Sequence, residues 1–149
     1  MSDQPAVGAE TEAAERACLR LVIESVRCND ERDWKGLVAL YSDDGVVQRP
    51  SGERIVGHDA ILASYSAGAP DRRTRHVCSN WTFALDDPTH AHGRTSVVVY
   101  AWDVSTERDP RLGYQLDSRV VIGDFADRFV LTDAGWRLAE RRATVVAHS

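Results

Sequence analysis

The chain has 149 residues and a mass of 16.5 kDa, a length that fits one domain with a core and space for a pocket. It is 43% hydrophobic and 28% charged, and it contains no run of about 18 apolar residues, the length needed to cross a bilayer. These features exclude fibrous, disordered and membrane-spanning classes. The net charge of -5 argues against a nucleic-acid partner, because the field of the protein repels polyanions.

Three cysteines are present, an odd number, and none forms a C-x-x-C pair. The N-terminus lacks the charged and then apolar pattern of a secretion signal. These features predict a reduced, cytoplasmic protein with neither disulfides nor a structural zinc ion.

Small and flexible residues at 1–9 predict a disordered tail, and 10–146 is expected to form a single domain. Residues 10–29 carry apolar and small side chains at the i, i+3, i+4 spacing of an amphipathic helix. A second, shorter helix should follow Asp33 as its N-cap, with Trp34 and Tyr41 among its inward side chains.

A small hairpin is expected over 45–56, and a third helix should open at Gly57 and stop before Pro70. The remainder is rich in β-formers and predicts four long strands, at 74–85, 91–104, 115–131 and 136–146. Helices followed by strands indicate the α+β class. We expect a curved antiparallel sheet that wraps around the three N-terminal helices as a cone, with a ligand site at its open mouth.

His76 lies within a strand pattern, where alternation places it on one face with Cys78 and Asn80. An imidazole that faces a dry cavity is the natural proton-transfer group at neutral pH. The competing interpretation is a structural histidine, satisfied by a neighbour or by solvent.

Asp30 follows the first predicted helix, and because Asp33 already fits the N-cap role, Asp30 is free for another task. A carboxylate that accepts a hydrogen bond from an imidazole fixes the tautomer of the ring and stabilises its protonated form. No serine stands in a G-x-S-x-G setting, so a pair of Asp30 and His76 would transfer protons rather than acyl groups.

Other side chains are candidates for either a pocket or the core. The aromatic candidates have helix or strand spacing: Tyr41, Tyr65, Tyr100, Trp102 and Phe125. Asp127 shares a face with Phe125 and is either a second pocket carboxylate or half of an ion pair with an arginine. The arginine-rich stretch 72–75 could receive an anionic substrate or form a solvated loop.

His90 and His92 share a strand face, as metal ligands can, but no third ligand stands at a recognisable spacing. We therefore expect no metal site.

Several motifs occur in an order that resembles the SnoaL-like branch of the nuclear transport factor 2-like superfamily. They are D30-x-x-D33-W34, L40-Y41-x-D43-D44-G45, G57-x-x-A60-I61, R75-H76-x-x-x-N80 and D127-x-F129 followed by G135-W136-R137. In scytalone dehydratase and hexachlorocyclohexane dehydrochlorinase of this branch, an aspartate on the first helix orients a histidine that removes a proton. Asp30 and His76 match these positions. The second catalytic histidine of scytalone dehydratase has no counterpart along 99–102, where a tyrosine and a tryptophan stand instead.

The expected function is that of a cofactor-free acid/base enzyme which eliminates, isomerises or cyclises a small, largely apolar molecule. His76 would be the base and Asp30 its orienting partner. Substrate contacts are expected from Tyr41, Tyr65, Asn80, Tyr100, Trp102, Phe125 and Asp127. The resemblance further implies a homodimer formed through the outer face of the sheet. The alternative is a non-catalytic binding protein, or a structural subunit similar to the small β subunit of ring-hydroxylating dioxygenases.

Overall fold

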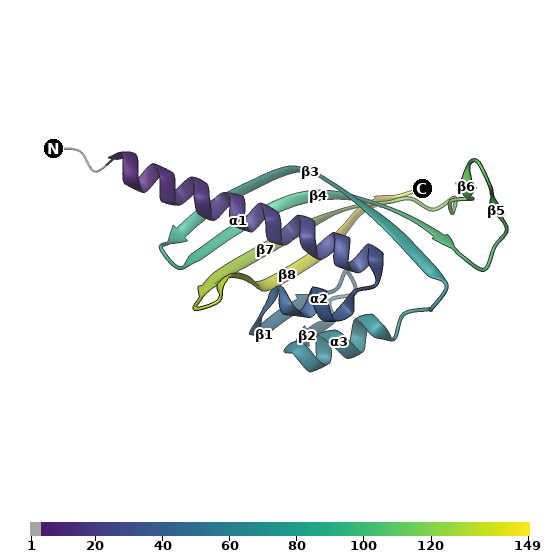
Figure 1. The fold of residues 1–149 in the computed structure, drawn as a ribbon, viewed down its shortest axis with the longest axis horizontal. Helices are drawn as coiled ribbons and strands as arrows, with labels where there is room; N and C mark the ends of the chain where they lie inside the picture. The colour runs from purple at the N-terminus through teal and green to yellow at the C-terminus, as the bar shows by residue number, and fades with distance from the viewer. Residues whose placement is uncertain (1–3) are drawn as a thin grey trace.

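The computed structural model describes residues 4–149, which form a long helix laid along one face of a curved sheet, with two short helices at its end (Figure 1). The helices are α1 (Gln4–Glu31), α2 (Trp34–Ala39) and α3 (His58–Ser66). The strands are β1 (Tyr41–Gln48), β2 (Arg54–Val56), β3 (Arg72–Asp87), β4 (His90–Asp103), β5 (Arg108–Asp109), β6 (Gly113–Tyr114), β7 (Val121–Thr132) and β8 (Gly135–His148). The α+β class and the curved sheet are confirmed.

Six strands form the main sheet in the order β2-β1-β8-β7-β4-β3. The long strands β3, β4, β7 and β8 are an antiparallel meander, as expected. The sheet as a whole is mixed, however, because β1 runs parallel to β8. The tight β3–β4 and β7–β8 hairpins force antiparallel pairing, whereas long connections, such as that between β1 and β8, leave either direction open. The expectation of a wholly antiparallel sheet was wrong at this one pairing.

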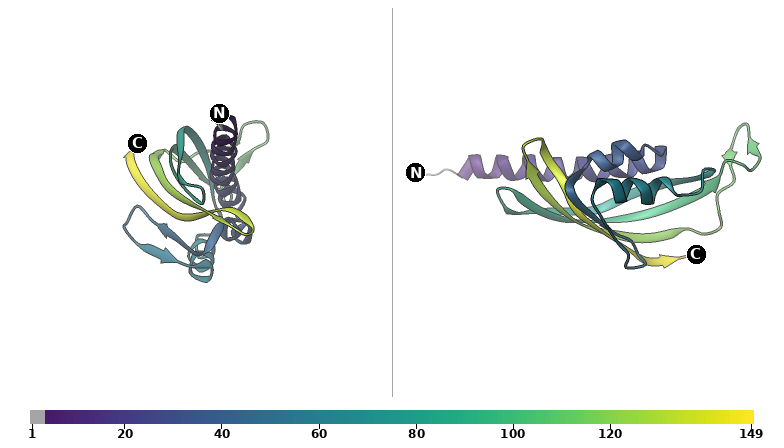
Figure 2. Two further views of the ribbon diagram at one scale, coloured as in Figure 1. Left: turned by 90° about the vertical axis from the view of Figure 1, so that its left-hand side faces the viewer. Right: turned by 90° about the horizontal axis from the view of Figure 1, so that it is seen from below.

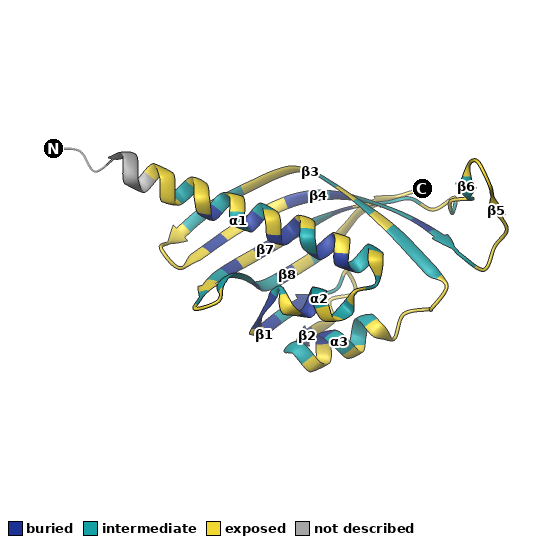
Figure 3. Ribbon diagram, viewed as in Figure 1, coloured by how far each residue is buried: buried dark blue, intermediate teal, exposed yellow. Residues whose placement is uncertain are grey.

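Helix α1 begins at Gln4, ahead of the expected start at residue 10. Of the tail expected at 1–9, residues 1–3 lie outside the described part of the chain. One face of α1 is buried and includes Cys18, Val22 and Cys28, which confirms its amphipathic character. This face packs on the concave side of the sheet (Figures 2 and 3), and the strands run on past the C-terminal end of α1. In residues 4–149 no helix combines the length and the apolar character needed to cross a bilayer.

Helix α1 ends in a turn that sends the chain directly into α2. The N–H of Arg32 donates to the carbonyl of Asn29 at 3.1 Å, and the N–H of Asp33 donates to the carbonyl of Cys28 at 2.8 Å. This Schellman arrangement holds Arg32 in the left-handed region, with φ of 61°, where glycine is the usual residue. A non-glycine residue there costs roughly 1–2 kcal/mol. Asp33 then caps α2, accepting from the N–H of Gly36 at 2.9 Å, as predicted.

Tyr41 is the first residue of β1 rather than the last turn of the second helix, which ends at Ala39. The strand begins early because the N–H of Leu138 in β8 donates to the carbonyl of Leu40 at 2.8 Å and draws this segment into the sheet. Tyr41 is nevertheless buried, in a core with Leu37, Ile61 and Leu138. Gly57 precedes α3 with φ of 86°, a conformation that favours glycine.

Strand β3 has a bulge between Ser79 and Thr82, where Asn80 adopts a φ of 50°. The one extra residue of the bulge reverses the alternation of side chains along the strand. His76 and Cys78 face α1 before the bulge, and Phe83 faces the core after it. The prediction that Asn80 shares a face with His76 was therefore wrong.

The predicted strand 115–131 starts only at Val121. Ahead of it, β5 and β6 pair as a separate two-stranded hairpin that projects from the end of the sheet (Figure 1).

Candidate active site

Asp30 lies at the C-terminal end of α1, where its carboxylate meets β3. Its Oδ1 accepts hydrogen bonds from the hydroxyl of Thr74 at 2.9 Å and from Nδ1 of His76 at 2.6 Å. Its Oδ2 accepts the backbone N–H of His76 at 2.9 Å. Only 10% of each of the Asp30 and His76 side chains is exposed. Two elements distant in sequence are thus joined by a carboxylate and an imidazole held in one geometry.

The tautomer of His76 follows from the chemistry of its partner. An ionised carboxylate can only accept hydrogen bonds, so Nδ1 of His76 carries a proton and Nε2 of the neutral ring is left as a base. Nε2 has no hydrogen-bond partner among residues 4–149. Around Asp30, Arg75 is the nearest cation, with Nε 3.9 Å from Oδ2, and its own side chain is largely exposed.

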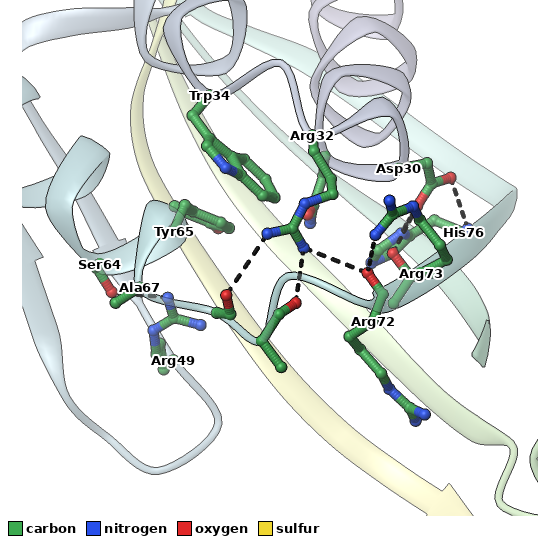
Figure 4. A pocket seen from close by; sticks show the side chains of 14 residues that line it. Asp30, Arg32, Trp34, Arg49, Ser64, Tyr65, Ala67, Arg72, Arg73 and His76 are labelled. Carbon is green, nitrogen blue, oxygen red and sulfur yellow. Dashed lines mark hydrogen bonds and ion pairs between the residues drawn. The ribbon is translucent and has the colours of Figure 1, made fainter. Parts of the chain in front are cut away.

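A cavity of about 520 Å³ opens beside this pair (Figure 4). Its walls come from the end of α1 and the turn after it, from α2, from Arg49 just after β1, from α3 and the turn after it, and from the start of β3. Asp30 and His76 also line a smaller space of about 340 Å³ between α1 and β3, together with Val26 and Cys78. The imidazole therefore borders two spaces, each large enough for a small molecule or part of one.

Aromatic rings and guanidinium groups form one wall of the larger cavity. The rings of Trp34 and Tyr65 have centroids 5.8 Å apart. The guanidinium of Arg32 lies 5.1 Å from the Trp34 ring, and that of Arg49 lies 4.9 Å from the Tyr65 ring. Burial raises the pKa of Tyr65, so its hydroxyl stays protonated and can donate a hydrogen bond. The lining of the cavity is therefore partly polar.

Among the aromatic candidates, Tyr65 alone is at this cavity wall. Tyr41 is 2% exposed within the core, where burial raises its pKa and its hydroxyl has no partner in the described residues. Val99 pairs with the inward-facing His76, so Tyr100 and Trp102, which stand one and three residues further along β4, lie on the outer face of the sheet.

Asn80 is exposed at the bulge and does not line the cavity.

Phe125 and Asp127 lie deep between the sheet and α1. Asp127 accepts two hydrogen bonds from Arg141, from Nε at 2.8 Å and from Nη2 at 2.7 Å. Nη1 of Arg141 donates to Ser25 on α1 at 2.8 Å, and the guanidinium stacks 4.0 Å from the ring of Phe125. Of the two alternatives for Asp127, the structure therefore has the ion pair, and Phe125 packs against it.

Four residues at or beside the site were not singled out as site residues from the sequence: Arg32, Trp34, Arg49 and Thr74. Thr74 had a signal, because it stands two residues before His76 and so shares its strand face. The other three converge from the turn after α1, from α2 and from the segment that follows β1, and no spacing within the sequence reports that convergence.

His90 and His92 lie at the β3–β4 turn, each beside an aspartate. Nδ1 of His90 is 3.0 Å from Asp87, and Nδ1 of His92 is 2.7 Å from Asp86. Within residues 4–149 no three His, Cys, Asp or Glu side chains gather as a metal site would require.

The sequence matches the SnoaL-like domain family over residues 10–142, which is most of the chain. The protein belongs to the SnoaL-like family. It thereby falls within the nuclear transport factor 2-like superfamily, which confirms the resemblance seen in the motifs. No curated protein sequence matches the chain.

Three solved structures illustrate what this SnoaL-like protein is similar to. A candidate scytalone dehydratase from Novosphingobium aromaticivorans is 22% identical, with 100% of this chain and 91% of that chain covered and a TM-score of 0.76. Hexachlorocyclohexane dehydrochlorinase LinA-type3 from Novosphingobium barchaimii is 15% identical, with coverages of 99% and 93% and a TM-score of 0.75. ActVI-ORFA from Streptomyces coelicolor is 16% identical, with coverages of 95% and 98% and a TM-score of 0.70. At these identities the likeness establishes a shared fold.

Proposed function

We propose that this protein is a cofactor-independent enzyme that removes a proton from a carbon atom of a small molecule. His76 is the general base, and Asp30 is the residue that positions and polarises it. The observation that carries the proposal is the 2.6 Å contact between Nδ1 of His76 and Oδ1 of Asp30 beside a cavity, with Nε2 left without a partner in the described residues. Geometry of this kind is what a base needs in order to be held ready for a substrate.

The proposed step is a proton transfer to Nε2 of His76. The substrate C–H bond breaks, its proton moves to Nε2, and the electron pair stays on the substrate carbon. Asp30 stabilises the imidazolium that forms, because the ionised carboxylate lies in contact with Nδ1–H. The backbone N–H of His76 and the Thr74 hydroxyl occupy two further acceptor positions and fix the carboxylate in place.

Three outcomes are open to the electron pair. Expulsion of a leaving group from the neighbouring carbon gives an elimination. Return of the proton from Nε2 to a different carbon gives an isomerisation. Attack on a carbonyl carbon of the same molecule gives ring closure. The reaction class we propose is therefore that of a lyase or of an isomerase or cyclase, and the names of the similar dehydratase and dehydrochlorinase structures, which describe eliminations, support the first.

The experiment is a screen of small carbonyl and halogenated compounds for exchange or elimination in deuterated solvent, followed by kinetics of variants. His76→Ala should lower kcat/KM by about 10²–10⁴-fold, the usual contribution of a positioned base. Asp30→Asn should lower kcat while the fold is kept, because the amide can bind the wrong tautomer of the ring.

His92→Ala is the matched control, since His92 is also paired with an aspartate, at 2.7 Å, but in an exposed position away from the cavity. It should leave the rate unchanged. Wild-type kcat/KM in His76→Ala would contradict the proposal and favour the non-catalytic binding protein or the dioxygenase-subunit type.

We also propose that the protein is a homodimer formed through the outer face of the sheet. Val77 and Ile122 are nearly half exposed there, beside Tyr100 and Trp102. Sedimentation at micromolar concentration should show a dimer, and a species of 16.5 kDa alone would contradict this.

The three cysteines are all free, which supports the cytoplasmic location proposed from the sequence.

A further inference from the structure

The cavity beside His76 carries more positive than negative charge. Four arginines line it, at positions 32, 49, 72 and 73, whereas Asp30 is its one carboxylate. Arg72 is neutralised by Asp117 and by Asp103, the latter at 3.3 Å. The other three arginines form no ion pair within residues 4–149.

Arg32 donates only to uncharged groups. Its Nη1 reaches the carbonyls of Ala69 at 3.1 Å and Arg72 at 3.2 Å, and its Nη2 reaches the carbonyl of Gly68 at 3.5 Å (Figure 4). Nε has no partner in the described residues, so donor capacity remains. The left-handed backbone of Arg32 adds a second observation, because the turn itself would be better served by glycine. A strained residue at a cavity wall points to a use for its side chain.

Arg49 reaches the same cavity from the end of β1. Its Nη2 donates to the Ser64 hydroxyl at 2.7 Å, and its guanidinium lies over the Tyr65 ring. These contacts hold the group in place without neutralising it. Arg73 is similar, since its Nη1 donates to the carbonyls of Pro70 at 2.7 Å and Arg72 at 3.0 Å.

We infer that the cavity binds a flat organic anion, a ring that carries a carboxylate or phosphate group. The ring contacts Trp34 and Tyr65, and the anionic oxygens accept hydrogen bonds from Arg32 and Arg49. Guanidinium groups are well matched to carboxylate and phosphate, and charge-assisted hydrogen bonds are the stronger kind. The inference rests on the proposed function, because it names the substrate class of that same site, and it replaces the largely apolar substrate expected from the sequence.

Such a substrate also fits the chemistry assigned to His76. Removal of a proton leaves an electron pair on the substrate, and cations held in fixed positions at the cavity wall stabilise the negative charge that develops. The arginines would therefore both select the substrate and support the transition state.

The test is calorimetric titration with a naphthoate, a naphthyl phosphate and the neutral naphthamide of the same ring shape. At least one anion should bind about tenfold more tightly than the amide, and added salt should narrow the difference. The anion that binds more tightly distinguishes carboxylate from phosphate recognition.

Arg49→Gln should abolish most of the preference for the anion, whereas Arg128→Gln, the same charge change at an exposed residue of β7, should leave it unchanged. Arg32→Gly should also weaken the binding of the anion. The Tm of this variant should equal or exceed that of the wild type, because the backbone strain is relieved. If this variant had a lowered Tm and kept the preference for the anion over the amide, the role of Arg32 would be purely structural and Arg32 would not belong to the anion site.

The inference is overturned if neither anion binds more tightly than the amide, or if Arg128→Gln has as large an effect as Arg49→Gln. His76→Ala should keep the preference for the anion, since equilibrium binding needs no base. A selective site without any proton-transfer activity would thus contradict the proposed function alone, and activity without selectivity would contradict the substrate class alone.

Discussion

Asp30 and Asp127 are both nearly buried carboxylates on the concave side of the sheet, yet they are partnered differently. Asp127 is 3% exposed and makes a two-point ion pair with Arg141, a group that holds its charge at every working pH. Asp30 faces an imidazole, which can lose and regain a proton, and it borders a cavity. Burial alone therefore does not distinguish the carboxylate that we propose to position a base from the carboxylate of an ion pair.

The partner and the access to solvent separate the two roles. Arg141 and Asp127 are linked to Ser25 on α1, so that the pair fastens the helix to the sheet. A permanent ion pair inside the molecule has no proton to exchange, and it leaves no acceptor lone pair facing a substrate. In the pair of Asp30 and His76, the imidazole can exchange a proton, and Nε2 has a lone pair available to a substrate. For this reason we place the proposed chemistry at the end of α1.

The largest expected effect that separates the two carboxylates is on stability. Asp127→Ala leaves Arg141 as an unpaired buried cation and should lower the free energy of unfolding by about 3–5 kcal/mol. Asp30→Ala should cost clearly less, because the cavity lets water reach the groups it leaves behind. Urea unfolding of both variants measures the difference. Equal losses would remove the distinction between a structural and a functional carboxylate.

A second effect should appear at high pH near Asp127. Burial first, and then the negative charge of Asp127, raises the pKa of the Cys18 thiol from 9.0 to about 12. Below the unfolded pKa both states hold the proton, so stability is complete there. Between pH 9.0 and about 12 only the unfolded chain releases it, and the free energy of unfolding should fall by up to about 1.4 kcal/mol per pH unit.

Cys18→Ala supplies the comparison for this titration. Its free energy of unfolding should vary less steeply with pH over that range than that of the wild type, as measured by urea unfolding at several pH values. Parallel curves would show that the thiol ionises equally in both states, and the closed interior around Asp127 would then need revision.

Much of the site was within reach of the sequence. Alternation placed His76 on one face of a strand, the cap role of Asp33 left Asp30 free, and the family resemblance paired the two residues. Asn80 was misplaced because a bulge that shifts the alternation depends on tertiary packing, which a regular strand pattern does not report. Asp127 stayed ambiguous because Arg141 is joined to it only through the register of β7 and β8.

The anion-binding wall was not predictable in the same way. Arg32 follows α1 and Arg49 follows β1, and each is held at the cavity by a contact with a residue in or just after α3. A sequence shows the charged residues, but it does not show which arginines are left without a carboxylate partner in the folded protein.

The central claim, that Asp30 holds His76 ready as a base, can be tested without knowing the substrate. Long-range proton–nitrogen NMR correlations on nitrogen-labelled protein report which imidazole nitrogen carries the proton. The account predicts that neutral His76 is protonated on Nδ1 in the wild type and that Asp30→Asn changes the tautomer population. Neutral His76 protonated on Nε2 in the wild type, or a population unchanged in Asp30→Asn, would contradict it.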